Sequence, residues 1–158
     1  MTHKATIAIL AGVLTLTATS ATAGEWRLLG IANTSGIAIA ADTSAVTGPQ
    51  TARSIRVAIA LRETTTTVGL TYDYLVEARV IDCVARVSAT RHRSLYTAAG
   101  VLVDQGPLDG TPTPVAANTL EDLILQAACK GQWLAVPPVV GAPDFVRAVR
   151  PILAPPAS

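Results

Sequence analysis

Residues 72–83 (YDYLVEARVIDC) constrain the fold of this chain more than any other stretch. They form the longest strand-like run in the sequence, and they end in one of only two cysteines. The other cysteine, Cys129, closes an amphipathic segment downstream. A bond between Cys83 and Cys129 would join a sheet and a helix into one unit.

Both faces of this central run carry apolar side chains. Strand alternation places one set of side chains on the first face: Asp73, Leu75, Glu77, Arg79, Ile81 and Cys83. It places a second set on the other face: Tyr72, Tyr74, Val76, Ala78 and Val80. Either the alternation shifts at a bulge, or the second face is covered by loops, by the C-terminal tail or by a partner.

Residues 1–23 have the form of a secretory signal peptide. A short start containing Lys4 precedes an apolar stretch over residues 5–19, which is too short to cross a bilayer as a helix. Ala21-Thr22-Ala23 is a small-x-small cleavage site. An uncleaved anchor or a buried helix is the alternative. We predict export to the periplasm or the outside of a bacterial envelope, with a mature chain that begins at Gly24 and has no membrane span.

The composition of the mature chain argues against nucleic acid as a partner. Removing residues 1–23 takes out one lysine and no acid, which leaves 11 basic and 11 acidic residues. A net charge near zero provides no electrostatic attraction to nucleic acid or to an anionic membrane. Aromatic residues for stacking on bases are few: one Phe, two Trp and three Tyr.

Export changes what the cysteines indicate. Two cysteines in an oxidising compartment most simply form one disulfide. A metal pair is the competing interpretation, but the mature chain has a single histidine, His92, and no Cys-x-x-Cys motif. We therefore predict no metal and no cofactor.

Alternation and turn residues predict further strands on both sides of the central run. They are expected over residues 25–31, 37–40, 54–61, 84–96 and 101–105. The threonines at 64–67 are expected to form a loop or a frayed strand end. The basic Arg91-His92-Arg93 sequence interrupts its strand, which indicates a bulge or an exposed end.

One helix is well signalled. Its apolar stripe is Leu120, Leu123, Ile124, Ala127 and Ala128. Asn118 or Thr119 can cap its start and Gly131 can end it. Cys129 lies off the stripe, so a bond to the sheet requires the helix to end or unwind nearby. Beyond it, residues 132–158 are rich in proline and are predicted to be an irregular tail, in which residues 144–150 could form one or two helical turns.

No catalytic constellation stands out from the sequence. There is no Gly-x-Ser-x-Gly elbow, no phosphate-binding glycine loop and no His-Glu-x-x-His motif. Arg86, Arg91, His92 and Arg93 form a small basic cluster that is a candidate binding patch for an anionic partner. Ordinary solvated charges on an exposed strand are the plainer interpretation of this cluster.

The order of these features resembles the bacterial surface-adhesin protein E family. Trp26 opens the first strand, Asp42-x-Ser44 follows, a strand ends at Asp82-Cys83, and Arg86, Tyr96, Gly100 and a helical Cys129 come after it. The resemblance covers about residues 25–131. It implies an α+β fold: an antiparallel sheet of about six strands with one C-terminal helix packed on one face, tied by a Cys83–Cys129 disulfide.

The resemblance also implies what such a protein does. The adhesin that defines the family is lipid-anchored, binds host matrix and plasma proteins, forms dimers and is linked to haem. This chain departs from it in having no cysteine after the cleavage site for lipid attachment, one mature histidine, and an additional proline-rich tail. We therefore expect residues 24–131 to be an exported, non-enzymatic binding or envelope-associated domain, adhesin-like, with a protein partner or a dimer. The alternative is a periplasmic inhibitor or accessory subunit that acts through sheet-edge pairing.

Overall fold

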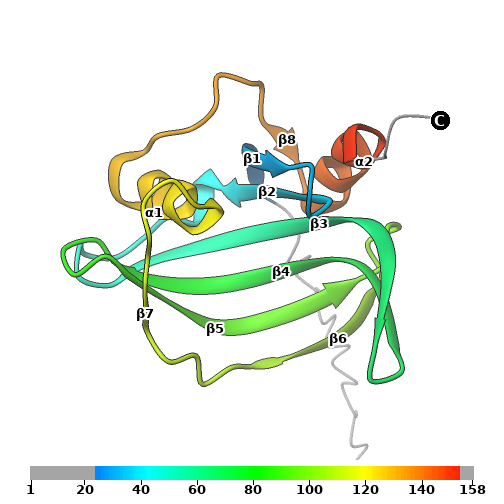
Figure 1. The fold of residues 1–158 in the computed structure, drawn as a ribbon, viewed down its shortest axis with the longest axis horizontal. Helices are drawn as coiled ribbons and strands as arrows, with labels where there is room; N and C mark the ends of the chain where they lie inside the picture. The colour runs from blue at the N-terminus through cyan, green and yellow to red at the C-terminus, as the bar shows by residue number, and fades with distance from the viewer. Residues whose placement is uncertain (1–23, 154–158) are drawn as a thin grey trace, which may run out of the picture.

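A computed structural model describes residues 24–153 of the chain, so the predicted signal peptide lies outside the described residues. The described part is built around one antiparallel sheet, whose strands follow the order β6-β5-β4-β3-β2-β1-β8, with β7 paired to β5 off this path (Figure 1). The strands are β1 (Glu25–Ala32), β2 (Ile37–Asp42), β3 (Arg53–Thr67), β4 (Leu70–Asp82), β5 (Val87–Tyr96), β6 (Leu102–Pro107), β7 (Thr113–Pro114) and β8 (Val139–Val140). The helices are the short 3-10 turn η1 (Thr43–Ala45), α1 (Leu120–Lys130) and α2 (Ala142–Leu153).

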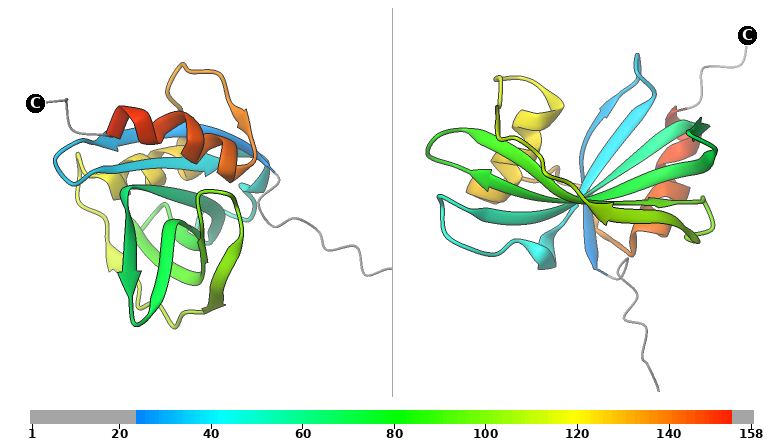
Figure 2. Two further views of the ribbon diagram at one scale, coloured as in Figure 1. Left: turned by 90° about the vertical axis from the view of Figure 1, so that its right-hand side faces the viewer. Right: turned by 90° about the horizontal axis from the view of Figure 1, so that it is seen from below.

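The predicted fold class is confirmed, with eight strands in the described residues instead of about six and with one additional helix. The sheet, helix α1 and the Cys83–Cys129 disulfide are all present. The addition is α2, which covers the face of the sheet opposite to α1, as the two views of Figure 2 show. The two helices therefore cover the two faces of the sheet around β1, β2 and β3.

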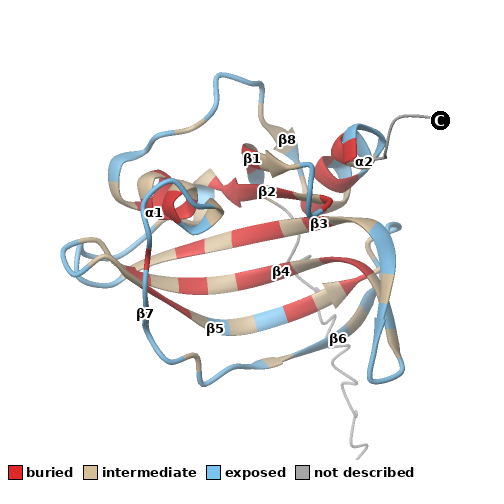
Figure 3. Cartoon of the chain, in the orientation of Figure 1, coloured by how far each residue is buried: buried red, intermediate tan, exposed pale blue. Residues whose placement is uncertain are grey.

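Strand β4 shows why both faces of the central run are apolar. Tyr74 and Val76 lie in the cluster beneath α2, whereas Ile81 lies in the cluster beneath α1. Helix α2, in the C-terminal tail, therefore covers the second apolar face of the central run. In Figure 3 buried residues recur along β3 and β4, as expected for strands covered on both sides.

The prediction of an irregular tail does not hold over residues 142–153, where α2 extends the one or two helical turns expected over residues 144–150. Pro143 lies in the first turn of this helix, where a missing N–H breaks no intrahelical bond, and Pro151 lies in the last turn. The helix buries Ala142, Phe145, Val146, Val149 and Leu153 against Trp26, Tyr74 and the small side chains Ala38, Ala40, Ala58 and Ala60. These alanines leave room for a helix to approach the sheet closely.

Polar contacts fix α2 in place. The Arg150 guanidinium donates to Asp73 Oδ1 at 2.8 Å and to the carbonyl oxygen of Arg62 at 3.3 Å. Arg62 in turn donates to the carbonyl oxygen of Leu153. Burial alone would raise the pKa of Asp73, but hydrogen bonds from Thr64, from the Ala98 N–H and from Arg150 outweigh it and lower the pKa.

Of the two structures expected for the threonine run, a loop or a frayed strand end, the structure has a strand end. Strand β3 continues to Thr67 and pairs with the start of β4, with Thr66 and Thr71 opposite each other. The two hydroxyls of that pair lie 3.0 Å apart. The hairpin turns at Val68 and Gly69, which both have positive φ, as a two-residue turn of type I′ requires.

Helix α1 begins and ends as the sequence predicts. Thr119 is the N-cap and its hydroxyl accepts a hydrogen bond from the Asp122 N–H at 3.2 Å. Gly131 ends the helix with φ of 62°, in the left-handed region that glycine adopts without strain. Between them Ile124, Ala127 and Ala128 face the sheet.

The disulfide forms without any unwinding of α1. Cys83 lies one residue beyond β4, in the turn to β5, and not on the face of the sheet. From there it reaches Cys129 in the last turn of α1, with a Cα–Cα distance of 5.7 Å. The bond joins the end of the sheet to the end of the helix, which resolves the conflict between the position of Cys129 and the apolar stripe.

Candidate functional site

A large cavity lies on the α1 side of the sheet. It has a volume of about 540 Å³ and is open to solvent between β4, β5, the first turn of α1 and the segment that connects β6 to β7. We call it the α1-side cleft. Its lining residues are Arg79, Ser88, Thr90, Arg93, Leu108, Asp109, Gly110, Thr111, Thr113 and Glu121.

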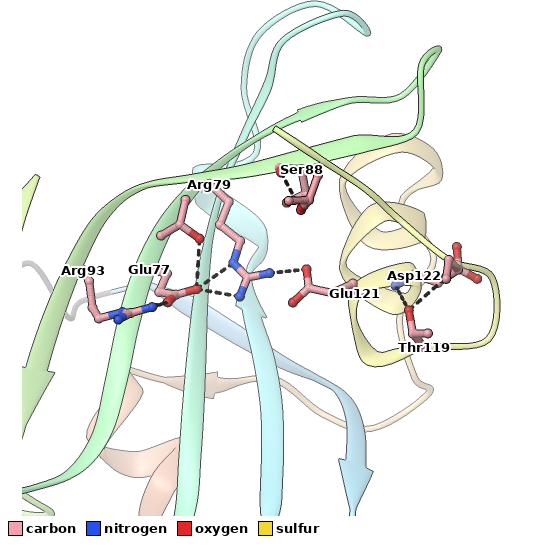
Figure 4. Close-up of polar contacts among 10 residues, drawn as sticks. Glu77, Arg79, Ser88, Arg93, Thr119, Glu121 and Asp122 are labelled. Atoms are coloured by element: carbon pink, nitrogen blue, oxygen red, sulfur yellow. Dashed lines mark hydrogen bonds and ion pairs between the residues drawn. The ribbon is translucent and has the colours of Figure 1, made fainter. Parts of the chain in front are cut away.

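An ionic network forms the wall of the cleft, and Glu77 is its centre (Figure 4). The Glu77 carboxylate is buried on β4 and accepts hydrogen bonds from Arg79 Nε at 2.8 Å and from Arg93 Nε at 2.9 Å. The Nη2 atoms of the same two arginines lie 2.5 Å and 2.7 Å from its oxygens. On the far side Arg79 donates to Glu121, in the first turn of α1.

The two inner members of this network are buried, and the two outer members are not. The side chains of Glu77 and Arg79 are 3% and 8% exposed, whereas those of Arg93 and Glu121 are 46% and 47% exposed. Burial alone would lower the pKa of Arg79, but the charge of Glu77 and the hydrogen bond to Glu121 outweigh it and raise the pKa. Arg79 therefore remains charged, and removing one member of the inner pair would leave the other buried without its main partner.

The segment from Leu108 to Thr113 forms the outer rim of the cleft. It rests on β5 through a hydrogen bond from the Leu108 N–H to the Arg91 carbonyl oxygen at 2.8 Å, and one from Thr113 Oγ1 to the Ser88 carbonyl oxygen at 3.3 Å. Gly110 is needed because a Cβ there would lie 2.2 Å from the Thr90 carbonyl oxygen. Only glycine lets the rim approach the strand this closely.

A second polar cluster holds the first turn of α1. The Asp122 carboxylate accepts hydrogen bonds from Arg86 at 2.7 Å, from the Asn118 N–H at 3.1 Å and from Gln126 at 2.8 Å. The bonds from Arg86 and Asn118 hold the pKa of Asp122 below its ordinary value. This cluster fixes the helix end that carries Glu121 into the cleft.

The four residues of the predicted basic patch do not lie together. Arg86 has φ of 53° in the β4–β5 turn and binds the α1 cluster. Arg93 lies in the cleft beside Glu77. His92, which pairs with Ala78, alternates to the opposite face of the sheet. Arg91 is exposed at the predicted bulge, which the register shift between Ala78 and Arg79 confirms.

Sequence reasoning therefore found Arg93 but missed the rest of the network. The signal was present in the central run, where Glu77 and Arg79 have opposite charges and share the face of the buried Ile81. Two charges on a face that is otherwise buried indicate a paired network. That Arg93 pairs with Glu77 and that Glu121 reaches Arg79 could not be assigned without the fold.

A second cavity adjoins the first along the open edge of the sheet. It has a volume of about 300 Å³ and shares Arg93 and Leu108 with the α1-side cleft. Its other lining residues come from β5 and from β6, which pairs with β5 on one side only. The two cavities together form a trough beside an unpaired strand edge.

The network is suited to recognition of polar groups. Within residues 24–153, no group of three or more His, Cys, Asp or Glu side chains is arranged to hold a metal ion. No helix in the same range is long and apolar enough to cross a membrane. The cleft instead offers paired guanidinium and carboxylate groups, the Ser88 and Thr90 hydroxyls, and one apolar side chain, Leu108.

Comparison with known proteins supports the resemblance drawn from the sequence. No curated protein and no solved structure matches the chain. The family model for surface-adhesin protein E matches residues 26–130, from the start of β1 to the end of α1. Helix α2 lies beyond this match. Since the match spans well over half of the sequence, the chain belongs to the surface-adhesin protein E family.

Proposed function

We propose that this protein is an exported, non-enzymatic binding domain that engages a protein partner at the α1-side cleft. Membership of a surface-adhesin family supports an adhesin-like role at the bacterial envelope. The proposed export pathway is the signal peptide of residues 1–23, cleaved before Gly24.

The observation that carries this proposal is the graded exposure of the ionic network. The buried Glu77–Arg79 pair is a fixed scaffold, and it holds one cation, Arg93, and one anion, Glu121, half exposed on either side. These outer groups can bind a partner's charged or amide groups while the inner pair stays intact. Because their positions are already fixed by hydrogen bonds, little side-chain freedom would be lost on binding.

A second candidate function is pairing of a partner strand with β6. The unpaired edge of β6 favours it, because main-chain N–H and C=O groups on such an edge can accept an additional strand. This is the mode expected of a periplasmic inhibitor or accessory subunit. The trough beside β6 would then receive the side chains of the added strand.

The test uses immobilised mature protein and saturable capture of a partner from envelope extracts and culture medium. Leu108→Glu places a charge in the cleft, and Val68→Glu places the same charge at the tip of the β3–β4 hairpin, where Val68 is 96% exposed. Both variants should fold, since neither residue is buried. Loss of the captured partner with Leu108→Glu but not with Val68→Glu supports the cleft, and equal capture by both variants argues against it.

Proline substitutions separate the two candidate functions. Successive N–H groups on a strand point to opposite sides. Asp104 and Gln105 are neighbours on β6, so a proline at one of these positions removes a hydrogen bond to β5. A proline at the other position removes only an N–H that points outward from the sheet edge. Edge pairing predicts that the variant with unchanged stability loses the partner. Retention of the partner by that variant, together with its loss in Leu108→Glu, assigns binding to the cleft.

A further inference from the structure

We propose that the fold contains a receptor for its own processed N-terminus: the α-ammonium group that cleavage before Gly24 creates binds the buried carboxylate of Asp42. This inference rests on the export and processing included in the proposed function. It adds a consequence, which is that removal of the leader completes an ion pair and stabilises the folded protein.

Asp42 is fully buried at the end of β2, beside the start of β1. Its Oδ1 accepts hydrogen bonds from the Glu25 N–H at 3.2 Å, from the Ser44 N–H at 3.0 Å and from Ser44 Oγ at 2.6 Å. Its Oδ2 accepts from Arg56 Nε at 3.1 Å. These donors hold the carboxylate rigidly, and Arg56 places a positive charge beside it.

Gly24 lies directly against this carboxylate. A Cβ on Gly24 would be 2.3 Å from Asp42 Oδ2, which means that no other residue fits here unless Asp42 moves. Since the backbone nitrogen is about 2.5 Å from a Cβ on the same residue, the Gly24 nitrogen lies within about 5 Å of Oδ2. The Gly24 carbonyl oxygen is also fixed, because it accepts a hydrogen bond from the Gly141 N–H at 3.0 Å.

Processing changes the charge at this nitrogen. Hydrolysis of the Ala23–Gly24 peptide bond by one water molecule, in a signal-peptidase reaction, leaves a carboxylate on Ala23 and an amino group on Gly24. At neutral pH that amino group is mostly protonated. A positive charge this close to Asp42 is favoured by the opposite charge.

Other charges near this end of the fold are already paired. Glu25 binds Arg27 at 3.1 Å, and in α2 Asp144 binds Arg147 at 2.9 Å. Arg56 shares Asp42, and its guanidinium also lies over the Trp26 ring. One carboxylate between two cations is an arrangement that this protein uses elsewhere, where Glu77 lies between Arg79 and Arg93.

The pH dependence follows from the sign of the interaction. Asp42 raises the pKa of the Gly24 ammonium in the folded state above the ordinary range of about 7.7–8.0. The added stability is therefore fully present below that range, and it is lost as the pH rises through the folded-state pKa. A chain that retains leader residues has its α-ammonium group elsewhere and therefore lacks this added stability.

The experiment compares two oxidised proteins, residues 24–158 and residues 21–158, each released from a fusion partner by a protease that leaves no residue. At pH 7 the shorter protein should melt at least about 3 °C higher, and the difference should disappear by about pH 10. In the shorter protein the chemical shift of Gly24 ¹³Cα should report a titration midpoint above the ordinary α-amino range. In the Asp42→Asn variant of that protein the midpoint should return to the ordinary range.

Two results would overturn the inference: equal melting temperatures of the two proteins from pH 6 to pH 10, or a Gly24 midpoint within or below the ordinary range. If Asp42→Asn does not fold, the titration of the unsubstituted protein still decides the question. Neither measurement uses a partner or an export pathway. Failure of the binding proposal would therefore leave these results unaffected, and failure here would leave the capture experiment unaffected.

Discussion

Breaking the Cys83–Cys129 bond should be among the most destabilising single changes in this protein. The bond closes a loop with a sequence separation of 46 residues. The chain-entropy estimate for a loop of this length is about 4 kcal/mol at 25 °C, as an upper figure. Total stabilities of domains are about 5–15 kcal/mol, so this one bond contributes a large share.

Cys83→Ser and Cys129→Ser should therefore lower the melting temperature by similar amounts, about 12–20 °C for a domain of this size. The double variant should be no less stable than either single one, because the same bond is lost in all three. Calorimetry and urea denaturation of the four proteins measure this, and the reduced unsubstituted protein should match the variants.

Two results would refute this reasoning. Thiol titration of the unreduced, unfolded protein could find two free thiols, which would mean that the bond does not form. Alternatively, the two single variants could differ widely in stability, which would mean that each cysteine acts through its own packing and not through a shared bond.

Three further predictions concern the charged network, the acid stability and the second helix. Arg79→Met should destabilise the protein by about 3–5 kcal/mol in urea denaturation, because the buried Glu77 carboxylate loses its buried cationic partner. Glu121→Gln, on the exposed side of the network, should change the stability by about 1 kcal/mol or less. The pKa values of Asp73 and Asp122 are lower in the folded protein than in the unfolded chain, where they are about 3.9. The stability that this difference provides is present above that value and is lost as the pH falls below it. The melting temperature should therefore drop between about pH 5 and pH 2, and it should drop less steeply in Asp122→Asn. Ending the chain after Val140 removes α2 and should expose the apolar face around Tyr74, seen as binding of a hydrophobic dye and a loss of cooperative unfolding.

Much of the core of this fold follows from short-range signals in the sequence. Strand alternation located β1 to β6, and the Thr119 and Gly131 caps located both ends of α1. The bulge at Arg91 followed from the basic residues that interrupt β5. These features depend on neighbouring residues only, which is why the sequence alone predicts them.

The features that the sequence did not predict depend on distant partners. The threonines at 64–67 have no apolar alternation, and they form a strand because β4 pairs with them. The prolines of the tail indicated irregular structure, but two of them, Pro143 and Pro151, lie in the first and last turns of α2, which the alanine-rich face of the sheet stabilises. In the same way, Arg93 gained its role from Glu77, which lies on the neighbouring strand.

The candidate site shows the same division. A cluster of basic residues close in sequence did not make a cluster in space, because alternation sends His92 and Arg93 to opposite faces and the turn carries Arg86 to α1. The network that does form draws its members from β4, β5 and α1. Its assembly requires the register of the sheet and the position of the helix, and neither is encoded locally.

Site-specific photo-crosslinking in the native envelope shows whether a protein partner binds at the α1-side cleft. A photoreactive residue is placed at Thr111, on the rim of the α1-side cleft, and in a matched protein at Ala148, an exposed position on α2 at the opposite face. We expect one discrete, saturable protein adduct from position 111 and none from position 148. An adduct of the same size from position 148 alone, or equally from both positions, would contradict the assignment of the cleft as the partner-binding surface.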